Sequence, residues 1–514
     1  MPHSKQNNQN SVLKKISNMK NLFFILILIF AAGCTDLQEE LREDLPEGTD
    51  PDPAALLASS YDAMRLPYQD QSRFWAAQQH TSDETLGPTR GPDWDDNGIW
   101  RSLHNHSWDE DHAFLGSTFS ELLQIVFSTS NMLQFSPAAQ DAAESRLIRA
   151  FVMNSVLDGW GQVPFREDPS DLLNDAQVLG PTEAIDFIMG EAQAIINDLP
   201  DGPANRANKD AARVLMMKTL LNRGMYLNRA APSFDNGDMS QVISLADQII
   251  GSGRYSLASN YYDNFAPNND QVSTENIFTA ENIGGVSSGN VRSRWFCTLH
   301  YNQNPSGWNG FTTLGDFYNS FEDVDIRQGA DYVGMTEVSG INAGFLVGQQ
   351  TDQDGNEILD RAGVPLSFTP EVAISESGAN LEQTGVRVIK YPIDYNSGDN
   401  VDNDYVYYRY ADVLLMRAEA QMRMGDSGSA LETVNEIRAS RGASALSSID
   451  ETTMLAERGR ELYWEGHRRT DLLRFGRFLD AWQEKPAGGE ERLLFPIPAA
   501  SLAGNPNLVQ NPGY

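Results

Sequence analysis

Apolar residues recur every three or four positions over much of this chain, which is the spacing that predicts amphipathic helices. Residues 182–199 carry the pattern clearly, and Pro200 follows them as a stop signal. The same spacing predicts helices over 209–228, 239–251, 407–424 and 456–477. Asp52-Pro53 predicts the start of another helix, because aspartate caps the first turn and proline fits its first position.

Short turns join several of these predicted helices. The helix 407–424 ends at Gly425, and Asp426-Ser427-Gly428 leads directly into the next apolar run. Helix pairs of this kind are typical of tetratricopeptide-like hairpins, which stack because one pair cannot cover its own apolar face. We therefore predict a mostly α fold with a tetratricopeptide-like helical-hairpin scaffold. A generic helical bundle is the alternative.

Helical spacing lapses in residues 66–111 and 253–406, which are rich in Gly, Asn, Asp, Pro and aromatic residues. They contain the turn sequences GGVSSGN, NPSGWNG and DQDGNEI, of which the last predicts a small hairpin. Long irregular loops in a compact protein are usually functional. We expect the scaffold to carry a large irregular ligand-binding region with a few short hairpins.

The N-terminus follows a different pattern. Its uninterrupted apolar run, residues 22–30, is too short to span a membrane, which takes about 20 residues, and it follows the lysines of a signal peptide. Ala31-Ala32-Gly33 before Cys34 resembles a lipobox, in which the cysteine thiol is acylated. We predict a lipoprotein signal peptide over 1–33, a lipid on Cys34 and a flexible, acidic tether over 34–53. The alternative is an ordinary signal peptide followed by a chance cysteine.

The rest of the chain divides by composition into two intertwined parts of one globular unit. We expect a helical N-terminal part over 54–252 and a C-terminal part over 253–514. The latter comprises a loop-rich stretch 253–406, a helical stretch 407–483 and a tail 484–514.

Acidic residues dominate the charge balance. The net charge is −33, and loss of residues 1–33, which carry four lysines and no acid, leaves about −37. Such a surface repels phosphates, so we expect no binding to nucleic acid, and membrane attachment has to come from the lipid. Cys297 has no partner once Cys34 is acylated, so we expect no structural disulfide.

Motifs for catalysis or metal binding are weak. The chain has no G-x-S-x-G, H-E-x-x-H or Walker A sequence. DWDDNG opens like a calcium loop but has His104 where a bidentate glutamate is needed, and His104, His106 and His112 lack a zinc-ligand spacing. We interpret both as ordinary loops and predict neither an enzyme, a cofactor nor a metal site.

Aromatic residues cluster inside the predicted loops. Trp94, Trp100 and Trp108 form one group, and Trp295, Tyr301 and Trp308 form another. Aromatic faces stack on sugar rings while polar neighbours bond the hydroxyls, although the same residues could be core. The predicted ligand site comprises Asp83, Arg90, Trp94, Asn97, Trp295, Cys297, Tyr301, Trp308 and Arg387.

Several longer blocks resemble one family. YYRYADVLLMRAEAQMRMG, ERGRELYWEGHRRTDLLRFGRF and LLFPIPAASLAGNPNLVQNPGY closely resemble signature blocks of SusD/RagB-like outer-membrane lipoproteins, and SDETLGPTRGPDWDDNGIWRSLHNHSW resembles that family's N-terminal half. The resemblance implies a lipid-anchored protein on the outer face of the outer membrane. It implies a lid over a SusC-like TonB-dependent transporter, to which the protein delivers captured oligosaccharide. A peptide ligand, as in RagB-like members, and a helical-repeat adaptor for proteins remain alternatives.

Charged residues in the strongest of these blocks have a different expected role. The helical spacing of residues 456–477 predicts an internal ion-pair network that fixes helices rather than a ligand site. Its members are Glu461, Glu465, Arg468, Arg469, Asp471 and Arg474.

Overall fold

The first helix begins where the Asp-Pro pair predicts. A computed structural model describes residues 51–514, and the predicted signal peptide, Cys34 and most of the tether lie outside the described residues. The Asp52 carboxylate accepts a hydrogen bond from the backbone amide of Ala54 at 3.1 Å, and helix α2 (Pro53–Gln69) follows. No helix in residues 51–514 is long and apolar enough to cross a membrane.

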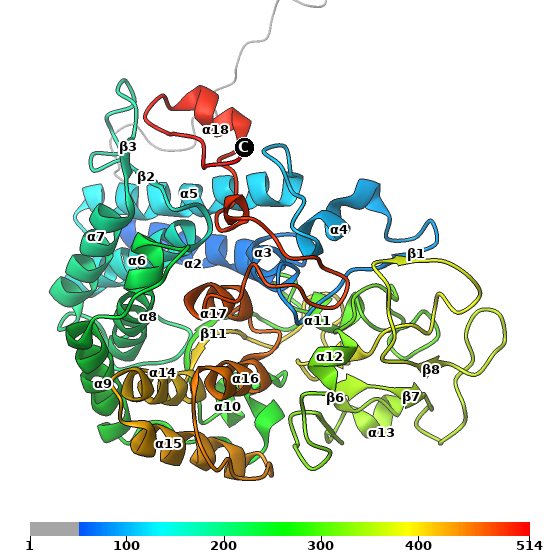
Figure 1. Cartoon of the computed structure of the whole chain (residues 1–514). Coiled ribbons are helices and arrows are strands. Elements are labelled where there is room, and N and C mark those ends of the chain that lie inside the picture. The colour runs from blue at the N-terminus through cyan, green and yellow to red at the C-terminus, as the bar shows by residue number, and fades with distance from the viewer. Residues whose placement is uncertain (1–50) are drawn as a thin grey trace, which may run out of the picture. The chain divides into compact units, whose positions relative to one another are not determined.

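Long helices form the scaffold, on the left in Figure 1. Neighbours along the chain pack against each other from α5 through α9, and α14 packs on both α9 and α15. This arrangement confirms the predicted mostly α, tetratricopeptide-like fold. The scaffold helices are α5 (Ala113–Met132), α6 (Ala139–Trp160), α7 (Pro181–Ile195), α8 (Lys209–Leu227), α9 (Asn236–Gly251), α14 (Tyr410–Arg423), α15 (Ser427–Ser440), α16 (Glu451–Leu462) and α17 (Arg468–Arg474).

Short elements and long loops make up the rest of the described chain. Those around β6, β7, β8, α12 and α13 form the loop-rich region on the right in Figure 1, whereas β2 and β3 lie beside α7 on the left. The short helices are α3 (Phe74–Gln79), α4 (Ile99–His104), α10 (Asn269–Val272), α11 (Ser293–Phe296), α12 (Gly315–Tyr318), α13 (Thr336–Ser339) and, in the tail, α18 (Ala499–Gly504). The strands are β1 (Thr89–Arg90), β2 (Val163–Phe165), β3 (Gln177–Leu179), β4 (Asn276–Ala280), β5 (Gly329–Ala330), β6 (Ala343–Leu346), β7 (Gly348–Gln349), β8 (Ser367–Phe368), β9 (Ser375–Glu376), β10 (Arg387–Ile389) and β11 (Tyr405–Arg409).

Small β-sheets connect the segments of this region to one another and to the scaffold. β10, β6 and β5 form a three-stranded antiparallel sheet, while β11 pairs with β4 directly before α14. The predicted DQDGNEI hairpin is present, because Thr351 pairs antiparallel with Glu357. One large core of buried side chains is continuous across both regions.

Three sequence predictions need correction. Residues 407–409 belong to β11, because they pair with β4 before α14 starts. Residues 456–477 form two helices, since Trp464 (φ 61°) and Gly466 (φ 77°) adopt left-handed backbone conformations that end a right-handed helix. The stretch 66–111, expected to be irregular, contains α3 and α4 because their apolar faces pack into the core.

The predicted ion-pair network is confirmed, and it lies in the interior. Glu461 contacts three arginines, Arg409 at 2.7 Å, Arg441 at 2.9 Å and Arg327 at 3.0 Å, all with fully buried side chains. These cations hold the pKa of the Glu461 carboxyl well below its usual range despite the burial that opposes ionisation. The network joins α16 to the strand β11 and to the loop around Arg327, so it connects the scaffold with the loop-rich region.

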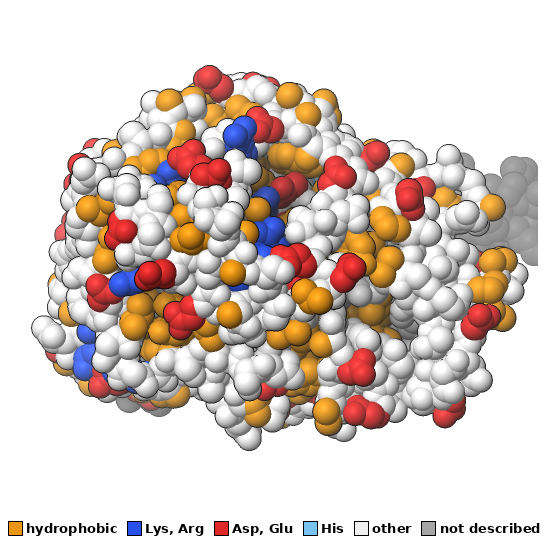
Figure 2. Space-filling view, turned by 60° about the horizontal axis from the view of Figure 1, so that its bottom comes forward, with side chains coloured by type: hydrophobic (Ala, Val, Ile, Leu, Met, Phe, Trp, Pro, Cys, Tyr) orange, Lys and Arg blue, Asp and Glu red, His pale blue; other side chains and the backbone are white. Residues whose placement is uncertain are grey.

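Acidic side chains are spread over the surface. The face of the described chain in Figure 2 carries scattered Asp and Glu side chains and few Lys or Arg side chains. This distribution matches the strongly negative net charge of −33. It offers no extended basic patch on that face for a phosphate backbone.

Candidate functional site

An open hollow lies where the two predicted aromatic clusters meet. Its volume is about 760 Å³, within the size range of ligand-binding clefts. We call it the aromatic hollow. It is lined by Gln71, Ser72, Pro92, Asp93, Trp94, Asp96, Trp100, Phe114, Tyr301, Trp308 and Arg361.

Two tryptophans form one wall of the aromatic hollow. The indole nitrogen of Trp94 donates a hydrogen bond to the backbone carbonyl of Trp308 at 2.9 Å, across 214 residues of sequence. Their rings lie 6.2 Å apart and are inclined by 58°, so they present an angled surface. The side chain of Trp308 is 46% exposed, whereas Trp100 beneath them is buried. An angled pair of aromatic faces suits a curved ligand with apolar C–H faces.

The backbone of residues 94–98 turns sharply to present this wall. Trp94 (φ 61°), Asp96 (φ 40°) and Asn97 (φ 54°) adopt positive φ angles, as does Gly98 (φ 80°). The Asp96 carboxylate accepts a hydrogen bond from the indole of Trp100 at 2.8 Å, which holds the turn on the core. Positive φ angles are rare outside glycine and cluster at functional sites.

Polar groups line another part of the aromatic hollow. The guanidinium of Arg361 stacks on the Tyr301 ring at 4.0 Å, and the Tyr301 hydroxyl donates to the Asp93 carboxylate at 3.3 Å. Arg361 also bonds the carboxylate of Glu382, which in turn contacts His300 at 2.8 Å. The aromatic hollow therefore combines aromatic faces with carboxylate, guanidinium and hydroxyl groups at their edges, an arrangement that can bind a polyol.

The structure brings three of the predicted ligand residues together, namely Trp94, Tyr301 and Trp308. Asn97 is exposed on the adjacent turn but does not line the aromatic hollow. Asp83 lies elsewhere, because Arg468 binds both of its carboxylate oxygens at 2.7 and 2.8 Å.

The remaining four predicted residues are in the interior. Trp295 and Cys297 are buried by the core around α11, and burial raises the pKa of the Cys297 thiol far above its usual range. Arg90 and Arg387 are buried and donate mainly to backbone carbonyls. The sequence suggested a ligand site at these four positions because it does not reveal whether an aromatic or charged side chain is buried or exposed.

Some lining residues carry no clear signal in the sequence. Arg361 and Phe114 come from segments without an aromatic cluster, and Gln71 and Ser72 follow directly after α2. The only signal for Asp96 is the DWDDNG turn, which resembles the opening of a calcium loop. Within residues 51–514, no group of three or more His, Cys, Asp and Glu side chains could hold a metal ion.

The three histidines, interpreted from the sequence as loop residues with local hydrogen bonds, contact backbone groups that are partly distant in sequence. His104 contacts the carbonyls of Thr85 and Gln483, and His106 contacts that of Thr81 at 2.9 Å. His112 accepts from the amide of Leu115 and so caps α5. Each ring thus contacts a backbone group, but His104 lies in α4 and reaches a carbonyl 379 residues away, so the local bonding expected from the sequence is wrong for this residue.

Gly310 is essential for the position of Trp94. A Cβ atom at residue 310 would lie 2.2 Å from Cζ2 of the Trp94 ring, far inside van der Waals contact. Gly310→Ala is therefore expected to displace Trp94, to lower the free energy of unfolding by about 1–3 kcal/mol and to change the near-UV circular dichroism. Gly190→Ala is the matched control, because the methyl group that it adds to α7 would have nothing within 4 Å, and it should be neutral or stabilising. Equal effects of both substitutions would contradict the close contact.

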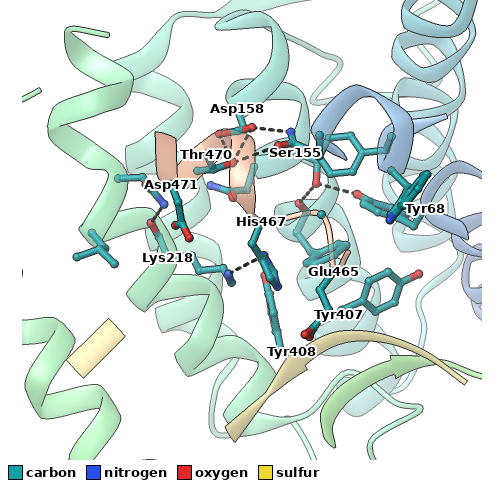
Figure 3. Close-up of a pocket in the computed structure, with 18 of the residues that line it drawn as sticks. Tyr68, Ser155, Asp158, Lys218, Tyr407, Tyr408, Glu465, His467, Thr470 and Asp471 are labelled. Atoms are coloured by element: carbon teal, nitrogen blue, oxygen red, sulfur yellow. Dashed lines mark hydrogen bonds between the residues drawn. The ribbon is translucent and has the colours of Figure 1, made fainter. Parts of the chain in front are cut away.

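A second, smaller cavity lies inside the scaffold, and Figure 3 shows its lining. It has a volume of about 100 Å³, enough for several water molecules. Lys218 contacts Asp412 at 2.7 Å and His467 at 3.4 Å, while Gln78 and Thr470 bond Asp158. These charges are paired with one another, so the cavity is part of the helix packing.

His467 makes this cavity sensitive to acid. Burial and the neighbouring Lys218 lower the pKa of His467 to about 4, against about 6.5 in the unfolded chain. Between these pH values the unfolded chain binds a proton there and the folded chain does not, so stability is lost as the pH falls through this window. From pH 7 to 4, wild type should lose up to about 3 kcal/mol more unfolding free energy than His467→Gln. Parallel losses in urea titrations of both proteins would contradict this.

Comparisons with known proteins agree with this architecture. A sequence profile of the SusD family matches residues 254–514. The starch-binding protein SusD of Bacteroides thetaiotaomicron is 27% identical over 414 residues, which cover 72% of each chain. A SusD superfamily protein from Parabacteroides distasonis superposes with a TM-score of 0.71 at 18% identity and covers 90% of this chain and 98% of that one.

One solved structure carries a glycan. Surface glycan-binding protein A from Bacteroides thetaiotaomicron, in complex with laminarihexaose, superposes with a TM-score of 0.64 at 18% identity and covers 89% of this chain and 98% of its own. At such identities the structural likeness establishes a common fold and not a common ligand.

Proposed function

Because this chain belongs to the SusD family, we propose that it is a cell-surface protein that binds oligosaccharide in the aromatic hollow. The observation that carries the proposal is the wall formed by Trp94 and Trp308, which joins two distant loops at an open cleft of about 760 Å³. Two relatives support it, since one is a starch-binding protein and another was solved with laminarihexaose. We propose binding without catalysis.

The charges around the aromatic hollow favour an uncharged glycan. Arg361 is the one cation among its lining residues in the described chain, and it already pairs with Glu382 and, at 3.7 Å, with Asp93. Asp93 and Asp96 add negative charge beside the aromatic faces. A sulfated or uronate polymer would meet repulsion there, whereas neutral sugar hydroxyls can bond both carboxylates.

A glycan array probed with the chain that follows Cys34 tests the proposal. We expect binding to neutral glucans or other uncharged polysaccharides and weaker binding to sulfated or uronate polymers. Each hit should also raise the melting temperature, because a ligand that binds only the folded state stabilises it. Absence of any glycan hit, together with stabilisation by peptides, would instead support a RagB-like peptide-binding function.

The proposal extends to membrane attachment through the lipid on Cys34. Cys34→Ala is expected to abolish labelling with radioactive palmitate and to leave uncleaved precursor or shed protein, because the acylated thiol is lost. Protease added to whole cells should digest the wild-type protein if it faces outward. Retained palmitate on the variant, or full protection from protease, would contradict this part of the proposal.

We also propose that a SusC-like TonB-dependent transporter receives the captured oligosaccharide. A binding protein without a channel needs a partner to import its ligand, and no helix in residues 51–514 could form a membrane span. Affinity purification in mild detergent from the native membrane should recover a barrel of that type in near-equal amount. Recovery of the binding protein alone in several detergents would count against the partnership.

A further inference from the structure

Two buried arginines lie directly behind the aromatic hollow. The side chains of Arg90, on β1, and Arg387, on β10, are 3% and 0% exposed. We propose that these two arginines are positioning residues that fix the tryptophan wall relative to Arg361 in the aromatic hollow. The consequence for glycan affinity rests on the proposed function, but the positioning itself does not.

Arg90 connects two loops through its guanidinium. Its Nε and Nη2 donate to the carbonyls of Asn309 and Gly310, both at 3.2 Å. Its Nη1 donates to the carbonyl of Leu381 at 2.8 Å and to the hydroxyl of Thr384. One planar group thus holds residues 309–310 against residues 381–384.

Arg387 also connects residue 309 to residues 382–385. Its Nη2 donates to the side-chain oxygen of Asn309 at 2.7 Å and to the carbonyl of Glu382 at 3.0 Å. Its Nη1 donates to the carbonyls of Thr384 and Gly385, both at 2.6 Å, and Phe368 covers the guanidinium at 4.4 Å. The same two loops are therefore tied together twice.

One of these loops carries Trp308 of the tryptophan wall, and the other holds Arg361 of the aromatic hollow. Asn309 and Gly310 directly follow Trp308, and the ring of Trp94 packs against Gly310. Glu382 bonds the backbone amide of Arg361 at 3.0 Å and also its guanidinium, which stacks on Tyr301. A shift of residues 309–310 relative to 381–385 would move Trp308 and Tyr301 together relative to Arg361, because backbone hydrogen bonds join residues 299–300 to 307–309.

The chemistry of the pair fits positioning better than a general contribution to packing. Burial lowers the pKa of the Arg90 guanidinium to about 10 and that of Arg387 well below its usual range, which reflects the cost of keeping both cations away from water. Arginine alone offers five donors in a rigid plane, and together the two satisfy carbonyls that would otherwise be buried without partners. A methionine of similar length could fill the space but could not hold either loop.

The test compares Arg387→Met and Asn309→Gly with Arg294→Met. Asn309→Gly is the milder variant, because it removes the side-chain oxygen that Arg387 binds while glycine accepts the φ of 52°. Arg294 is a matched control, since it is equally buried but donates to Ser293 and stacks on Trp75 at 3.9 Å. Each full-length chain is labelled with 5-fluorotryptophan, and ¹⁹F resonances are assigned by single Trp→Phe substitutions.

We expect the Trp94 and Trp308 resonances to shift or broaden in Arg387→Met and Asn309→Gly. Amide hydrogen exchange of residues 308–311 and 382–386 should quicken at least about tenfold in both. In Arg294→Met only the Trp75 resonance should move, whatever the loss of overall stability. With the glycan identified on the array, affinity should fall about tenfold in the first two variants and stay constant in the control.

The ligand-free readouts decide the inference. If the resonances and the exchange of both loops match wild type in Asn309→Gly and Arg387→Met, the two arginines do not position the tryptophan wall. If Arg387→Met does not fold, Asn309→Gly still gives the answer. If the resonances move but no glycan binds wild type, the positioning stands and the proposed function fails.

Discussion

Replacing Glu461 with glutamine is expected to lower the free energy of unfolding by about 3–5 kcal/mol, because buried cations lose a charged partner. The Glu461 carboxylate bonds Arg327, Arg409 and Arg441 in a region closed to water. Glutamine keeps the shape but supplies no negative charge, and its amide group would point donors at guanidinium donors. Urea unfolding followed by circular dichroism measures the change.

Glu451 provides the matched control on the same helix, α16. Its carboxylate contacts Arg423 at 3.1 Å, but its side chain is 70% exposed. Solvent screens such a pair, so Glu451→Ala should cost less than about 1 kcal/mol. If Glu461→Gln cost no more than Glu451→Ala, the interior network would not hold the two regions together as we infer.

Replacing Trp308 with alanine is expected to weaken glycan binding at least about thirtyfold, the loss typical of a main anchor residue at about 2 kcal/mol. Its ring is 46% exposed and forms part of the angled wall with Trp94. Since much of the ring already contacts water, stability should change little. Calorimetry with the glycan identified on the array and thermal unfolding separate the two quantities.

Trp295→Ala shows what a core tryptophan does instead. Trp295 is 3% exposed, so its removal should lower the free energy of unfolding by about 3–5 kcal/mol through the cavity left behind. Unchanged affinity in Trp308→Ala would remove this residue from the site. A large fall in its melting temperature would instead assign Trp308 to the core.

The aromatic clusters illustrate how far the sequence leads toward the site. Trp94, Tyr301 and Trp308 are expected from the sequence to belong to loops that converge, and the structure places them around one hollow. Composition cannot distinguish them from Trp295, because exposure depends on which distant segments pack over a ring. The hydrogen bond between Trp94 and the Trp308 carbonyl spans 214 residues, and no local pattern predicts such a contact.

The charged residues predicted to bind ligand also could not be assigned from the sequence alone. Asp83, Arg90 and Arg387 look like hydroxyl-binding groups beside aromatics, yet Asp83 binds Arg468 and the two arginines bind backbone carbonyls. The type of a charged residue in a loop does not reveal whether its side chain faces a ligand or an internal partner. Only the positions of the acceptors decide between these roles.

The sequence by itself determined the paired helices, the start of α2 at Asp52-Pro53 and the membership of Glu461 in an ion-pair block, because helical spacing and capping are local properties. The tertiary structure alone decided where α16 and α17 separate, which tryptophans are exposed and which loops form the hollow. Those features depend on packing between segments far apart in the chain, as the contact of Trp94 with Gly310 shows. Burial, and with it the role of each aromatic or charged side chain, is a property of neighbours that only folding brings together.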